Sequence, residues 1–154
     1  MKQTLLSIAV LSILSGCSTP SSRNARPVVL SAEVRYLSTE DQLLNLHNQV
    51  RRSHGLGALE IDPHLAAYAQ NWAETMAGQC SLAHSGLSFM QGSGFLTGAE
   101  NIAFNQGSTT HVMQSWLNSA GHRKNILTRQ FRVVGFGIAR NASGQPYLSA
   151  VFGG

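Results

Sequence analysis

Apolar residues recur at helical spacing near the middle of this chain. The first predicted helix runs from Thr39, where Gln42 completes a capping box, to about Ser53. Its apolar stripe consists of Leu43, Leu46 and Val50, with His47 and His54 on the same side. Because His47 lies within this apolar stripe, we expect it to be a core histidine rather than a ligand.

The second predicted helix is rich in small residues. Asp62 is expected to cap its N-terminus, Pro63 suits its first turn, and Gly78 is expected to end it. Its apolar positions at helical spacing are Leu65, Ala66, Ala69, Trp72, Ala73 and Met76. Because alanine side chains leave room beside a helix, we expect another element to pack closely here.

The remaining part of the chain changes from helical to strand patterning. A third helix is capped by Ser108 or Thr109 and breaks at residues 119–121. Residues 132–139 and 147–152 are rich in β-formers, with a turn rich in Asn, Ser, Gly and Pro between them. Helices followed by a hairpin predict an α+β fold, in which helices cover a sheet.

The N-terminal segment predicts export and lipidation. A short cationic start precedes the apolar stretch Leu5–Leu14, which is shorter than the ~20 residues of a membrane span and suits a signal peptide. It ends in Leu14-Ser15-Gly16-Cys17, which resembles the bacterial lipobox, whose cysteine becomes acylated. Acylation at Cys17 would anchor the chain to a membrane. Ser18 at the next position favours the outer membrane of a Gram-negative cell.

These features predict three segments. Residues 1–16 form a lipoprotein signal peptide, residues 17–37 a lipidated tether, and residues 38–154 one folded domain. We expect this domain to lie in the periplasm or at the cell surface.

Composition supports an exported globular domain. The 43% hydrophobic and 12% charged residues exclude a disordered chain. With Cys17 acylated, Cys80 has no partner for a disulfide, and we expect Cys80 to be a small buried residue rather than a nucleophile. The formal net charge is +4, but the basic residues are scattered, which argues against a nucleic-acid partner.

Three short segments carry the candidate chemistry. They are Ala83–Ser85, Ala99–Ile102 and Ser119–Leu127, which contain His84, Glu100 and His122. Two imidazoles could hold Zn²⁺ or another divalent metal, with the Glu100 carboxylate as a third ligand or as the group that orients one imidazole. Alternatively, one histidine acts as a general base on water, or the three side chains only tie a loop to a helix.

Several motifs, taken in order, resemble the CAP superfamily of cysteine-rich secretory proteins, antigen 5 and pathogenesis-related 1 proteins. They are His47-Asn48, Leu56–Leu59, Trp72, Cys80–Ser85, Glu100–Ile102 and Trp116–Leu127. The resemblance implies an α–β–α sandwich with a central antiparallel sheet flanked by helices. It also implies a cleft with two histidines and two acids, here His84, His122 and Glu100. The second acid is absent, because Asn118 and Ser119 stand where it is expected.

The resemblance favours binding over catalysis. It suggests a membrane-anchored module that binds a lipid, glycan or protein of the cell envelope, with a cleft able to hold a divalent metal. The alternative is a metal-assisted hydrolase of envelope material, for which His84, Glu100 and His122 are the catalytic candidates. Beyond Zn²⁺ or a similar ion, the sequence indicates no cofactor.

Overall fold

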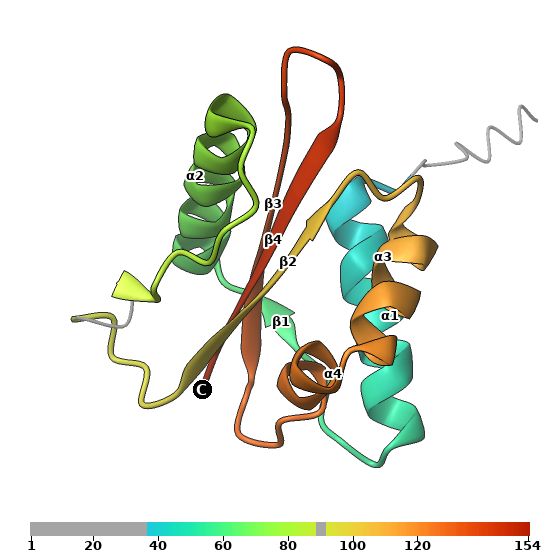
Figure 1. The fold of residues 1–154 in the computed structure, drawn as a ribbon. Coiled ribbons are helices and arrows are strands. Elements are labelled where there is room, and N and C mark those ends of the chain that lie inside the picture. Colours follow the sequence, from blue (N-terminus) through green and yellow to red (C-terminus); the bar gives the residue numbers. More distant parts are fainter. Residues whose placement is uncertain (1–36, 89–91) are drawn as a thin grey trace, which may run out of the picture. The chain divides into compact units, whose positions relative to one another are not determined.

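Four helices and four strands make up the part of the chain that the structure describes (Figure 1). The structure is a computed structural model that describes residues 37–88 and 92–154. The predicted signal peptide, Cys17 and all but the last residue of the predicted tether lie outside these residues. From Arg35 to Gly154 the chain forms one compact unit with its own core. None of the described helices is long and apolar enough to cross a membrane.

The sheet is mixed, with strand order β1-β3-β4-β2. Strands β3 (Val133–Arg140) and β4 (Pro146–Gly153) form the predicted hairpin, and β2 (Gly98–Phe104) pairs antiparallel with β4. The short strand β1 (Glu60–Ile61) lies parallel to β3. The prediction of an antiparallel sheet is therefore confirmed for β2, β3 and β4. It is wrong for β1, which is parallel to β3 and is separated from it in the sequence by three helices and β2.

Helices cover both faces of the sheet, which confirms the predicted α–β–α sandwich (Figure 1). Helix α2 (Pro63–Gln79) packs on β3 and β4 from one side. The other side carries α1 (Thr39–Ser53), α3 (Thr109–Asn118) and α4 (Ala120–Ile126). The site described below forms where the chain that follows α2 meets β2.

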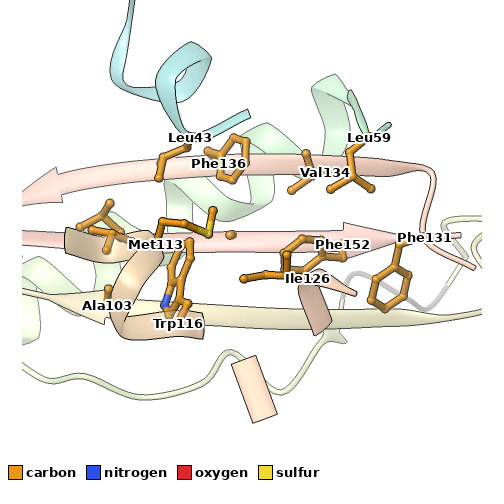
Figure 2. Packing of buried hydrophobic residues seen from close by; sticks show 13 residues of the cluster. Leu43, Leu59, Ala103, Met113, Trp116, Ile126, Phe131, Val134, Phe136 and Phe152 are labelled. Carbon is orange, nitrogen blue, oxygen red and sulfur yellow. The ribbon is translucent and has the colours of Figure 1, made fainter. Parts of the chain in front are cut away.

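The larger core lies between the sheet and the three helices on that side. Figure 2 shows its side chains, among them Leu43 from α1, Trp116 from α3 and Phe152 from β4. The imidazole of His47 lies in the same region, with its ring centroid 5.7 Å from that of Trp116 and 5.2 Å from that of Phe136. Both Trp116 and His47 are buried, which confirms the prediction that His47 is a core histidine.

Helix α2 packs directly against the backbone of β3. A Cβ atom at Gly135 would come within 2.0 Å of the Leu65 carbonyl carbon, and one at Gly137 within 2.2 Å of the Ala69 carbonyl carbon. Such contacts leave no room for any side chain, so both strand positions must be glycine. The close packing predicted from the small residues of this helix is confirmed.

Arg51 is a buried cation that the sequence analysis did not single out. Its side chain is fully buried in α1 and donates hydrogen bonds to the backbone carbonyls of Gly57, Ile126, Thr128 and Phe131, at 2.8–3.0 Å. Two of these carbonyls lie at the C-terminal end of α4, where a cation is favourable. Arg51 therefore connects α1 to the loop that follows it and to the segment at the end of α4.

Three local predictions need correction. Ser38, not Thr39, caps α1, because its Oγ accepts from the Asp41 N–H. Gly78 lies inside α2, and Cys80 ends this helix in the left-handed region, with φ of 50°. At this position Cys80 is exposed rather than buried, since a residue just past the end of a helix projects toward solvent.

Candidate functional site

His84 and Glu100 form a hydrogen-bonded pair. The Nδ1 atom of His84 lies 2.8 Å from Oε2 of Glu100, with the imidazole 58% exposed and the carboxylate side chain only 2% exposed. Because a carboxylate only accepts hydrogen bonds, Nδ1 carries the hydrogen in this pair. The other ring nitrogen, Nε2, then carries the free lone pair, as an orienting role for Glu100 requires.

The carboxylate of Glu100 is held from three directions. Besides His84, the backbone N–H of Ser85 donates to Oε2 at 3.0 Å, and the Ser149 hydroxyl donates to Oε1 at 3.4 Å. A buried carboxylate is costly unless donors surround it. The bond from Ser149 on β4 therefore fixes the carboxylate of Glu100, which accepts hydrogen bonds from the segment that carries His84.

The segment that carries His84 is also anchored to α2. The indole Nε1 of Trp72 donates to the carbonyl of Ala83 at 2.8 Å. Glu100 holds the next two residues, so the backbone is fixed on both sides of the imidazole. After this point Gly86 and Leu87 turn the chain, with φ of 76° and 57°.

His122 lies on α4, with its ring centroid 6.5 Å from that of Trp116. Partial burial lowers the pKa of His122 below its ordinary value, and the nearby His84 lowers it further. The lower pKa favours the neutral imidazole, which is the form that binds metal.

Asparagine side chains connect α4 to the free edge of β2. Asn125 donates to the backbone carbonyl of Glu100 at 3.3 Å and to Asn101 Oδ1 at 2.9 Å. Asn101 in turn donates to the carbonyl of His122 at 3.1 Å. Two residues along the strand from Glu100, the carbonyl of Ile102 accepts from Trp116 Nε1. These bonds fix α4 beside the carboxylate.

A cavity of about 460 Å³ opens beside the pair. It is lined by His84, Gly86, Leu87, Gly98, Ala99, Glu100 and Asn125. Small residues dominate one side of this lining, which lets a ligand approach the backbone. The structure thus places His84 and Glu100 on the cavity wall, while His122 is not among the lining residues.

The side chains suit an orienting pair better than a set of three metal ligands. Within residues 37–88 and 92–154, no three His, Cys, Asp or Glu side chains are grouped as ligands of one ion. Glu100 already serves three donors, which leaves the two imidazoles as the available metal-binding groups. Asn118 ends α3 and Ser119 precedes α4, so neither supplies a second acid.

Two contributors to the site were not expected from the sequence. Ser149 reaches Glu100 only because β2 and β4 pair in one particular register, and nothing in the local sequence of β4 marks it. Trp72 is among the apolar positions predicted for this helix, but its indole also anchors the carbonyl of Ala83. The remaining histidines, His54, His64 and His111, are exposed.

Comparison with known proteins gives consistent matches. The family model "CAP: Cysteine-rich secretory protein family" matches residues 44–152. The uncharacterised protein YkwD of Bacillus subtilis is 29% identical over 132 residues, which cover 80% of this chain and 51% of YkwD. This chain therefore spans about half the length of that relative.

Solved structures have the same fold. An outer surface protein of Borrelia burgdorferi superimposes with a TM-score of 0.66 at 19% identity, covering 73% of this chain and 89% of that chain. An extracellular protein of Bacillus anthracis that contains an SCP domain gives a TM-score of 0.62 at 29% identity, covering 74% of this chain and 39% of that chain. Both are described as surface or extracellular proteins.

Proposed function

Because the chain belongs to the cysteine-rich secretory protein family, we propose that it is a binding domain of the bacterial cell envelope, anchored through Cys17. In this role the cavity at His84 and Glu100 receives the ligand. The ligand is a component of the envelope, and the folded domain lies outside the cytoplasm. The surface and extracellular descriptions of two relatives support this location.

The single observation that carries the proposal is the His84–Glu100 pair. An exposed imidazole is held through Nδ1 by a buried carboxylate, and Nε2 faces away from that bond. Because the imidazole is already held in one orientation, ligand binding loses little further conformational entropy of this side chain. His84, Ser85 and Ser149 all donate to Glu100, so hydrolysis would have to use an imidazole as its general base. The second acid is absent, because Asn118 and Ser119 stand at its expected place, and this favours binding over hydrolysis by two carboxylates.

His84 and His122 are the residues that would hold a divalent metal such as Zn²⁺. Both are imidazoles, and the lowered pKa of His122 keeps it in the neutral form that a metal requires. Bound there, Zn²⁺ would supply a Lewis-acidic position for an oxygen or nitrogen of the ligand. Glu100 would act by orienting His84 and raising the basicity of its free nitrogen.

Isothermal titration with Zn²⁺ tests this proposal. We expect about one equivalent of Zn²⁺ to bind the wild-type chain, and the binding to be lost in His84→Ala and in His122→Ala. His64→Ala is the matched control, because His64 is an exposed histidine on α2 outside the site. Equal uptake by all four proteins, or hydrolysis of an envelope extract by the wild type alone, would contradict the proposed role.

A further inference from the structure

A second hollow lies on α2, beside the segment that carries His84. It has a volume of about 240 Å³ and is lined by Tyr68, Asn71, Trp72, Thr75, Ser85 and Ser88. The chain that leaves α2 runs back along this helix and forms the other wall (Figure 1). Ser85 follows His84 directly, so one turn of the chain contributes to both the cavity at Glu100 and this hollow.

The aromatic rings of this hollow are fixed in place. Tyr68 and Trp72 are four residues apart on α2, so they share one helix face with Asn71 and Thr75. Both rings are half-buried, with Trp72 packed against the cluster of Met76 and Tyr68 against that of Leu65. The bond from Trp72 Nε1 to Ala83 prevents the indole from turning. Rigid aromatic surfaces of this kind bind a ligand with little loss of conformational entropy.

Polar groups surround these rings, and none of the lining side chains is an acid or a base in the neutral pH range. The exposed carboxamide of Asn71 has no hydrogen-bond partner among the described residues. Ser85 Oγ accepts from the Leu87 N–H at 3.2 Å, which leaves its hydroxyl hydrogen available to a ligand. An uncharged lining gives no reason for an ion or a phosphate to bind, and its hydroxyl and amide groups disfavour a lipid chain.

We propose that this hollow binds one neutral sugar ring of an envelope glycan. The apolar C–H face of a pyranose would lie on Trp72, while Asn71 and Ser85 bond to its hydroxyl groups. The volume of 240 Å³ is below the ~300–1,000 Å³ of pockets for larger ligands, so it suits a single ring. This inference rests on the proposed envelope-binding role. The sugar would bind the hollow on α2, however, and not the cavity at His84 and Glu100.

Fluorescence and NMR titration with neutral trisaccharides tests this inference. The probes are triacetylchitotriose, cellotriose and maltotriose at millimolar concentration, added to the full-length chain in a detergent without a sugar headgroup. The chain has two tryptophans, of which Trp116 is buried and bonded to Ile102. A ligand-dependent change in fluorescence is therefore expected to come from Trp72.

Matched variants locate the binding. We expect Asn71→Ala to weaken binding by about fivefold to tenfold, the effect of losing roughly one hydrogen bond, with no loss of folding. Trp72→Phe keeps an aromatic ring but loses indole surface, and is expected to weaken binding as well. Gln79→Ala on the same helix, outside the hollow, should bind as the wild type does.

Two outcomes would overturn the inference. They are no response to any of the three probes, and binding that Asn71→Ala and Trp72→Phe leave unchanged. Because zinc uptake depends on His84 and sugar binding on Asn71, failure of one measurement leaves the other result intact.

Discussion

Nδ1 of His84 lies 2.8 Å from Oε2 of Glu100, which joins an exposed imidazole to a carboxylate that is almost completely buried. The two residues are 16 positions apart, in the irregular segment after α2 and on strand β2. Trp72 holds Ala83 from the other side and so keeps this segment beside the carboxylate. The contact between His84 and Glu100 thus depends on the position of α2 on the sheet as well as on the hydrogen bond between the two side chains.

Glu100→Gln is expected to weaken zinc binding by about 10- to 100-fold, because a partner that orients a metal-binding histidine has effects of this size. The amide also brings a donor where His84 and Ser85 both donate. Isothermal titration with Zn²⁺ measures the change. Glu74→Gln, a carboxylate on the exposed side of α2, is the control and should match the wild type. Unchanged affinity in Glu100→Gln would show that the carboxylate does not orient the imidazole.

His47 predicts an acid-sensitive core. Burial lowers its pKa from 6.5 to about 4, so the folded protein keeps this imidazole neutral while the unfolded chain takes up a proton below pH 6.5. The unfolded state then binds more protons, so the free energy of unfolding is full above about pH 6.5 and falls as the pH drops toward 4. The shift corresponds to roughly 3 kcal/mol in total.

Urea unfolding at about pH 7 and about pH 5 tests this relationship. We expect His47→Leu to lose less stability than the wild type between the two conditions, because leucine has no proton to bind. It also removes the buried Nε2 atom, which has no hydrogen-bond partner. His64→Gln, at an exposed position, should follow the wild type. Parallel pH dependence in His47→Leu and the wild type would disprove the effect.

Gly135→Ala is expected to destabilise the protein by at least ~3 kcal/mol or to prevent folding, since its Cβ would overlap the backbone of Leu65. Gly78→Ala is the matched comparison. Its Cβ would meet nothing within 4 Å, and it lies inside α2, so we expect a gain of up to ~1 kcal/mol from helix propensity. Equal effects in the two variants, measured by urea unfolding, would contradict the close packing of α2 on β3.

Arg51→Lys is expected to cost about 3 kcal/mol or more, although it keeps the charge. A lysine ammonium cannot reproduce the planar fork that reaches Gly57, Ile126, Thr128 and Phe131, so several buried carbonyls lose their donors. The neighbouring Arg52→Lys, at an exposed position, should change the unfolding free energy by less than about 0.5 kcal/mol. A tolerated Arg51→Lys would mean that the charge alone matters.

Cys17→Ser tests the proposed anchor. Acylation at this cysteine would hold the chain on the membrane, so the variant should move from the membrane fraction to the soluble fraction of the envelope. Metabolic labelling with a fatty acid gives the direct readout, and Cys80→Ser is the control for labelling at the other cysteine. Membrane association that persists in Cys17→Ser would rule out this anchor.

Three short motifs, each with one ionisable side chain, were sufficient to predict His84, Glu100 and His122 as candidate site residues. The fold class followed from periodicity and turn residues, since both depend on local sequence. Cap positions were less certain because adjacent residues such as Ser38 and Thr39 carry the same chemistry, and only the helix geometry selects one.

Contacts between distant residues could not be predicted in this way. The bonds of Arg51 join residues up to 80 positions apart, and the donor Ser149 depends on strand register. Cys80 was predicted to be buried because a lone cysteine is typically a small buried residue, but it lies at the end of α2 and is exposed. These features depend on how the helices and strands pack against one another, which cannot be derived from local sequence patterns.

Long-range ¹H–¹⁵N NMR of the histidine rings tests the pairing of His84 with Glu100, because it reports the protonation and metal binding of each ring nitrogen. We predict that Nδ1 of His84 carries the hydrogen, and that the Nε2 signal shifts when Zn²⁺ is added. In Glu100→Gln this tautomer preference should weaken. A ring with the hydrogen on Nε2, or an Nε2 signal that zinc leaves unchanged while other histidines respond, would contradict the role given to this pair.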